Sequence, residues 1–256
     1  MDAQRYPEDY DGILAGCPPI SETHHVAGLV WDLQATQNDR ASYIPARKIR
    51  SISAAVLNAC DAQDGVKDGI VADPRQCHFD PATMLCKSTD SNSCLTAPQV
   101  AALKKIYSGP RNSKGESIYP GYMPGGEGGP EGWAFSITGP APDQSPQLVI
   151  ANTVFSNMVF EDPAWNFKTF NFDSGVKFTD EKLARDINAT DSNLKPFMMR
   201  GGKLIIYHGW NDATIPAMST INYYNSVVAA MGIRDTSSFL RLYLAPGVQH
   251  CEDKVP

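Results

Sequence analysis

The chain has 256 residues and a formal net charge of −6 at neutral pH. This length allows one large domain or two smaller ones, and the acidic balance argues against nucleic acid or an anionic membrane as a partner. No apolar run approaches the roughly 18 residues that span a bilayer, and the first residues lack the pattern of a signal peptide.

From the N-terminus, the sequence predicts a short helix that ends at Tyr6-Pro7 and then a short buried strand within residues 10–16. From about Ser21 to Asn188 it predicts many loops, few strands and two helices, over residues 47–60 and 97–107. The second helix begins with Thr96 and carries Gln99 three residues later, which indicates a capping box. Strand–helix alternation returns after Met199, so we expect a sheet-forming unit interrupted by a long insertion.

Six cysteines are present, and four of them form two short pairs. Cys60 and Cys77 flank a loop rich in Asp and Gly, while Cys86 and Cys94 flank a small polar loop. Pairs of this kind are typical of disulfides in an oxidising compartment, whereas a metal site would require C-x-x-C pairs or interleaved histidines. We therefore predict two disulfides and a secreted protein, extracellular or periplasmic. Cys17 and Cys251 are left over from these two pairs, and we expect at least one of them to pair outside this chain.

The segment 203–216, KLIIYHGWNDATIP, provides the first candidate for chemistry. Residues 204–207 predict a parallel strand buried on both faces, and Asp212 follows it closely. A helix over residues 221–231 and a strand over 239–244 come next, followed by His250. Ligands and catalytic groups gather at the carboxyl ends of parallel strands, and this is the Asp…His order of α/β-hydrolases. Alternatively, Asp212 caps a helix and His250 is an ordinary loop histidine.

A second candidate lies between Cys60 and Cys77, where Asp61, Asp64 and Asp68 are separated by glycines. Three carboxylates on one closed loop can converge on a hard cation that takes six to eight oxygens. The spacing is not that of an EF-hand. Solvated Asp-Gly turns explain the pattern equally well.

The third candidate is the glycine-rich run at residues 125–132, which lacks the Lys-Ser/Thr of a phosphate loop. The nearby apolar residues Trp133, Phe135 and Ile137 either line a pocket or form a small core of the insertion.

Together these segments resemble the tannase/feruloyl esterase family, which includes a bacterial enzyme that hydrolyses a terephthalate monoester. The similarity rests on AQRYPEDYDGILAG at 3–16, CDAQDGVKDGIVADPRQC at 60–77, GYMPGGEGGPEGW at 121–133, DPAWNFKTFNFD at 162–173, HGWNDATIP at 208–216 and QHC at 249–251. In this order, the six segments resemble the family's segment after the nucleophile, its calcium loop, its lid, the stretch that leads from the lid back to the core, and its acid and histidine motifs. These anchors span nearly the whole chain.

The resemblance implies a partial α/β-hydrolase core at residues 1–20 and 191–256, interrupted by a large irregular lid domain at 21–190. It implies Asp212 as the catalytic acid and His250 as the base. Structural calcium would be bound by the side chains of Asp61, Asp64 and Asp68 and by the carbonyls of Val66 and Ile70. Cys251 would pair with a cysteine that precedes the nucleophilic serine.

The family's serine lies in a GCSxGG motif, and this sequence contains neither GCSxGG nor G-x-S-x-G. The expected function is a carboxylic ester hydrolase acting on small aromatic acid esters through a Ser-His-Asp acyl-enzyme mechanism. The chain by itself is expected to be an inactive fragment whose serine is supplied by an N-terminal segment. The alternatives are a non-catalytic calcium-stabilised binding remnant and a processed subunit that is active only with an N-terminal partner chain.

Overall fold

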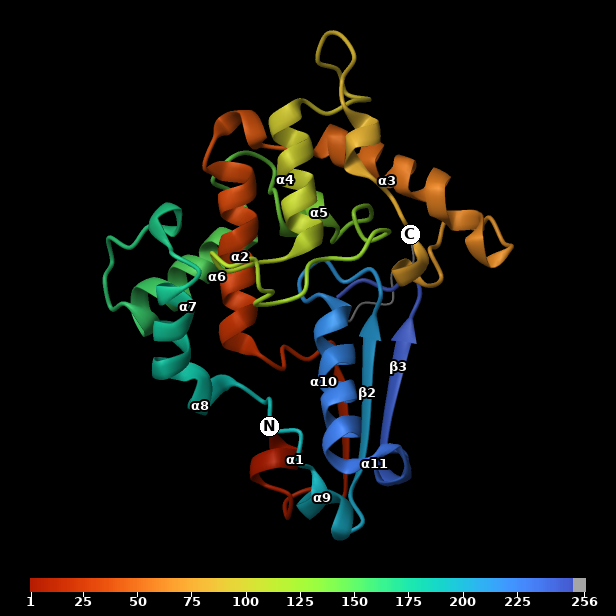
Figure 1. Ribbon diagram of the computed structural model, residues 1–256, viewed down its shortest axis with the longest axis vertical. Coiled ribbons are helices and arrows are strands. Elements are labelled where there is room, and N and C mark those ends of the chain that lie inside the picture. Colours follow the sequence, from red (N-terminus) through yellow and green to blue (C-terminus); the bar gives the residue numbers. More distant parts are fainter. Residues whose placement is uncertain (251–256) are drawn as a thin grey trace.

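A parallel three-stranded sheet forms one end of the molecule in the computed structural model, which describes residues 1–250 (Figure 1). Its strands are β1 (Gly12–Gly16), β2 (Lys203–Gly209) and β3 (Leu240–Ala245), in the order β1-β2-β3. All three predicted strands are confirmed. β1 and β2 are far apart in sequence but paired in space, so the insertion between them leaves the sheet and returns to it.

The prediction that β2 is buried on both faces is wrong for the described residues. Leu204 and Ile206 are buried, whereas Ile205 between them is 42% exposed. Successive side chains of a strand point to opposite faces, and only one face of this sheet is covered. On the other face, Leu14 and Tyr243 are 69% and 58% exposed. The apolar run therefore predicted the strand correctly but overestimated how much of it is buried.

Helices cover the buried face of the sheet. The confirmed helix α10 (Ala217–Met231) joins β2 to α11 (Ile233–Phe239) and β3, and contributes Tyr223 and Val227 to the apolar cluster there. The short helices α1 (Asp2–Arg5) and α9 (Lys195–Met199) close the lower end of the same layer (Figure 1).

The insertion is more helical than the sequence predicted. The two predicted helices are present as α3 (Ala46–Cys60) and α4 (Ala97–Ser108), and the Gln99 side chain accepts the Thr96 N–H at 3.1 Å. The sequence reading missed α2 (Glu22–Gln37), because most of its residues are buried and it therefore lacks the polar stripe of a surface helix.

Shorter elements complete the insertion and have the following bounds: η1 Arg40–Ser42, η2 Asp61–Asp64, η3 Pro74–Gln76, η4 Pro81–Met84, α5 Trp133–Ser136, α6 Pro146–Val154, η5 Phe155–Val159, η6 Phe167–Thr169, α7 Ser174–Thr179, η7 Asp180–Ala184 and α8 Arg185–Ile187. Both predicted disulfides, Cys60–Cys77 and Cys86–Cys94, are confirmed. The domain boundaries stay predictions. Among the described residues, no helix is long and apolar enough to cross a membrane.

Candidate active site

The loops that follow β2 and β3 are bonded to one another, and this brings the two sequence-predicted catalytic residues together. The Trp210 N–H donates to the Ala245 carbonyl at 2.9 Å, and the Asn211 N–H donates to the Val248 carbonyl at 3.0 Å. Gly209 permits this approach, since a Cβ there would lie 2.2 Å from the Val248 carbonyl oxygen. Asp212 and His250, 38 residues apart in sequence, therefore face each other at the carboxyl edge of the sheet.

Asp212 is buried and uses both of its oxygens. Oδ2 lies 2.8 Å from Nδ1 of His250 and 3.1 Å from Nε2 of His208. Oδ1 accepts the N–H groups of Thr214 and Ile215, each at 2.8 Å. A buried carboxylate with four donors is held in one orientation and stabilised as an anion. The helix-cap alternative does not fit, because α10 begins after Pro216.

Electrostatics separate the two members of this pair. Burial opposes ionisation of Asp212, but the hydrogen bonds from His208 and His250 outweigh it and hold the Asp212 pKa well below its usual range. The hydrogen bond with Asp212 is the largest cause that raises the pKa of His250, to about 10, and the neighbouring Cys17 is the next. The His250 side chain is 36% exposed, so one side of the imidazole faces solvent.

His208 supports the acid from within the protein. It is fully buried, its Nδ1 lies 2.8 Å from the Thr220 hydroxyl, and its Nε2 lies 2.9 Å from the Ile215 carbonyl as well as near Asp212. Two acceptors at Nε2 place the ring hydrogen there, so Nδ1 accepts from Thr220. Only the fold shows that His208 positions Asp212.

Cys17 is a neighbour that sequence reasoning missed. It follows β1 directly, is buried, and adopts a positive φ of 42°. Its sulfur lies within 4.8 Å of a ring nitrogen of His250 and a carboxylate oxygen of Asp212. The available signal was its position at the end of a strand, because the carboxyl ends of adjacent parallel strands meet at one edge.

The glycine-rich segment packs against the loops that carry Asp212 and His250. Asn211 donates to the Gly125 carbonyl at 2.7 Å, and Gln249 donates to the Gly128 carbonyl at 2.7 Å. A Cβ at Gly126 would lie 2.8 Å from the Asn211 carbonyl oxygen, so this approach requires glycine. The segment therefore fixes the residue before each member of the pair.

The apolar residues after this segment belong mainly to the core of the insertion. Trp133 and Ile137 are fully buried in an apolar cluster with residues of α3 and α4, while Phe135 is exposed. This settles the open alternative in favour of a core for Trp133 and Ile137.

The carboxylates of the acidic loop, residues 61–70, do not point toward a common centre. Asp61 is buried and accepts the N–H groups of Asp68 and Gly69, while Asp64 accepts from Val66, and Asp68 accepts from Ile70. Among the described residues, the three carboxylates do not form a group whose oxygens all lie within 4.8 Å of one another. The donor set is all oxygen and chemically suits calcium, but its side chains close local turns.

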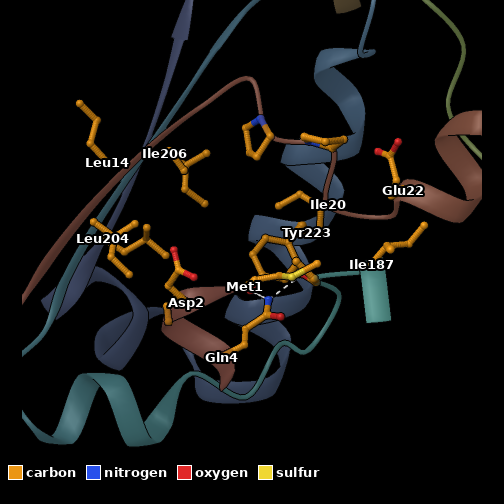
Figure 2. A pocket seen from close by; sticks show the side chains of 16 residues that line it. Met1, Asp2, Gln4, Leu14, Ile20, Glu22, Ile187, Leu204, Ile206 and Tyr223 are labelled. Carbon is orange, nitrogen blue, oxygen red and sulfur yellow. Dashed lines mark hydrogen bonds between the residues drawn. The ribbon is translucent and has the colours of Figure 1, made fainter. Parts of the chain in front are cut away.

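A groove of about 370 Å³ lies elsewhere, beside β1 (Figure 2). Its wall includes Leu204, Ile206 and Ile20, and the Gln4 side chain donates to the Tyr223 hydroxyl at 2.7 Å. Neither Asp212 nor His250 lines it, so it is a separate feature of the sheet's buried side.

An acid after β2, a histidine after β3 and a parallel sheet define this molecule as α/β-hydrolase-type. The profile described as "Tannase and feruloyl esterase" matches residues 1–255. The chain belongs to the tannase and feruloyl esterase family.

Three comparisons give the range of similarity. An uncharacterized esterase of Xanthomonas campestris is 38% identical over 97% of this chain and 47% of its own length. The mono(2-hydroxyethyl) terephthalate hydrolase of Piscinibacter sakaiensis is 31% identical over 98% and 49%, respectively. The crystal structure of feruloyl esterase B from Aspergillus oryzae superposes with a TM-score of 0.88 at 26% identity, over 98% of this chain and 49% of that one. The chain thus spans about half the length of these relatives.

Proposed function

We propose that this chain is the acid- and histidine-bearing part of a carboxylic ester hydrolase that acts on esters of aromatic acids. The observation that carries the proposal is the 2.8 Å contact between buried Asp212 and the half-exposed His250 at the carboxyl edge of the sheet. The printed names of the relatives, a terephthalate monoester hydrolase and a feruloyl esterase, support an aromatic acid as the substrate's acyl group.

In the proposed mechanism, the Nδ1–H of neutral His250 donates to Asp212, and this leaves Nε2 to accept the proton of a serine hydroxyl. The serine oxygen attacks the ester carbonyl, and the imidazolium then protonates the departing alcohol. In the second half, His250 activates water, which attacks the acyl-enzyme and releases the aromatic acid. Asp212 stays ionised throughout and stabilises the imidazolium.

We propose that the serine comes from an N-terminal segment that carries GCSxGG and covers the open side of the sheet. Two features support this. β1 lies at an edge of the described sheet, and its face with Leu14, Ile205 and Tyr243 exposes apolar side chains that a soluble protein usually covers. The relatives are also about twice as long as this chain.

Calcium at the acidic loop is a second part of the proposal. Asp61, Asp64 and Asp68 would provide carboxylates, and Val66 and Ile70 would provide carbonyls. Bound calcium would supply a fixed positive charge that draws these groups out of their separate turns. Ile70 packs near Gly247, with 3.1 Å from its Cδ1 to the position of a Cβ there, so an ordered loop would support the segment before His250.

The two disulfides support an oxidising location, and we propose secretion to the periplasm or the exterior. Residues 21–190, which pack over the catalytic loops through the glycine-rich segment, are proposed to act as the lid that shapes the substrate pocket.

The test joins residues 1–256 to an N-terminal segment ending in GCSxGG and measures release of ferulate, gallate and terephthalate from their esters. Hydrolysis by the joined protein, and none by the chain alone, is the expected result. His250→Ala should lower kcat by about 10⁴–10⁶-fold, because members of a triad act as a unit.

His78→Ala serves as the matched control, because His78 is exposed and directly follows the Cys60–Cys77 disulfide, outside the loops that carry Asp212 and His250. It should leave hydrolysis unchanged. Turnover by the joined protein that survives His250→Ala would place the active site elsewhere and refute the proposal.

A further inference from the structure

A thiol, an imidazole and a carboxylate meet at the carboxyl edge of the sheet. The Cys17 sulfur, a His250 ring nitrogen and an Asp212 oxygen all lie within 4.8 Å of one another. Each comes from the end of a different strand, so the sheet itself holds them together. Cys17 and Asp212 are buried, while His250 is partly exposed and gives access from solvent.

The positive φ of Cys17 is the second observation. A non-glycine residue rarely adopts this conformation, and such backbone is found where surrounding structure dictates it, often at functional sites. The Cys17 N–H still donates to the Tyr207 carbonyl at 2.9 Å, so the residue stays attached to β2 while its backbone turns away from the strand.

We propose that Cys17, His250 and Asp212 form a binding site for a borderline-soft divalent cation, and Zn²⁺ is the ion that fits these donors. Thiolate sulfur, imidazole nitrogen and carboxylate oxygen are the three side-chain donors that zinc takes in proteins. Three protein ligands leave a fourth position for water. The thiolate and the carboxylate together balance the charge of the ion, which is favourable in a buried place.

One pair of donors already lies near the separation that zinc requires. His250 Nδ1 and Asp212 Oδ2 are 2.8 Å apart, and tetrahedral zinc would separate such donors by about 3.3 Å. The ion replaces the proton that these two atoms share and the proton of the thiol. Oδ1 of Asp212 keeps the amides of Thr214 and Ile215, and His208 keeps its bond to Oδ2, so the carboxylate is already positioned by an outer layer of partners.

Zinc binding would release protons and would therefore tighten as the pH rises. It would also occupy the imidazole that the proposed hydrolysis uses, so the ion would inhibit that reaction. The metal site itself does not depend on the hydrolase proposal, because its three donors are all on this chain.

Another cluster of potential ligands fails on chemical grounds. Cys86, Asp90 and Cys94 also lie within 4.8 Å of one another, but the two sulfurs are joined in a disulfide and are not available as thiolates. It provides no competing site while the disulfide is intact.

The test uses Co²⁺ as a coloured substitute for zinc, titrated into the non-reduced 256-residue chain with excess Ca²⁺ present. The expected result is a thiolate-to-cobalt charge-transfer band that saturates at about one equivalent and is removed by Zn²⁺. Cys17→Ala should weaken binding by at least about 100-fold, since loss of an outer-layer partner alone costs about 10–100-fold. Cys17→Ser gives a second, nearly isosteric variant, and circular dichroism shows whether each variant is folded.

Two further variants separate the possible sources of a band. His250→Ala should lower the affinity for cobalt by about 10–100-fold or more. Cys251→Ser should leave the affinity and the band unchanged. The proposal is overturned if no band forms, if the band survives in both Cys17 variants, or if His250→Ala leaves cobalt affinity unchanged.

Discussion

The loop of Asp212 and the loop of Asp61 both present carboxylates in local turns, but Asp212 also has a partner from a distant segment of the chain. Asp212 accepts from His208 and from the amides of Thr214 and Ile215, which are two to four residues away, and also from His250, which is 38 residues away. Asp64 and Asp68 instead accept N–H groups two residues ahead, within their own turns. The contact with His250 therefore ties the Asp212 carboxylate to the tertiary structure.

This difference shows what each loop needs in order to act. Asp212 is oriented and ionised by the protein alone, so its chemistry is preorganised. The carboxylates of the acidic loop have their bonds made locally and would have to turn toward a common centre. A cation could provide that centre and would then contribute its binding free energy to folding. Four predictions test this contrast, from the largest expected effect to the smallest.

Asp212→Asn in the joined protein should lower kcat by about 10⁴-fold, because an amide cannot hold the productive tautomer of His250 or stabilise its cation. The measurement is steady-state hydrolysis of an aromatic ester, with Asp64→Asn as the matched acid-to-amide control. If Asp212→Asn lowers activity no more than Asp64→Asn does, Asp212 has no special role.

Removal of calcium should destabilise the 256-residue chain by about 2.7 kcal/mol relative to a hundredfold excess of the ion over its Kd. The melting temperature is compared with and without a chelator, in the wild type and in Asp64→Ala. The variant should melt at the same temperature under both conditions. If the chelator does not change the wild-type melting temperature, the acidic loop does not bind calcium.

Gly126→Ala should lower the free energy of unfolding by about 1–3 kcal/mol, since its Cβ would press on the backbone of Asn211. Chemical denaturation measures the change. Gly28→Ala in α2 is the control, because its Cβ would meet nothing nearer than 3.5 Å and alanine is the better helix former. Equal effects of the two changes would contradict a tight contact between the glycine-rich segment and the loop of Asp212.

The smallest effect concerns pH. Since the hydrogen bond with Asp212 raises the pKa of His250 to about 10, its protonated form is favoured in the folded state. This stabilisation should be complete below about pH 6.5 and disappear as the pH rises toward 10. The melting temperature of His250→Gln should therefore fall below that of the wild type at pH 6 and approach it by pH 10. A constant difference across this range would show that His250 titrates normally.

Local patterns in the sequence determined much of this protein. The apolar runs predicted all three strands, Thr96 and Gln99 marked the start of α4, and short cysteine spacings predicted both disulfides. The contact between Asp212 and His250 could be predicted because strand ends in a parallel sheet share one edge. These features depend on residues close in sequence or on a topology that few folds satisfy.

Tertiary structure alone decided the remainder. The helix α2 lacks a polar stripe because neighbours surround it, and Ile205 is exposed because only one face of β2 is covered. His208 and Cys17 acquire their roles from Asp212 and His250, whose approach depends on backbone bonds between the loops after β2 and β3. A sequence records which donors exist, but distances between donors on different strands are set only when the sheet forms.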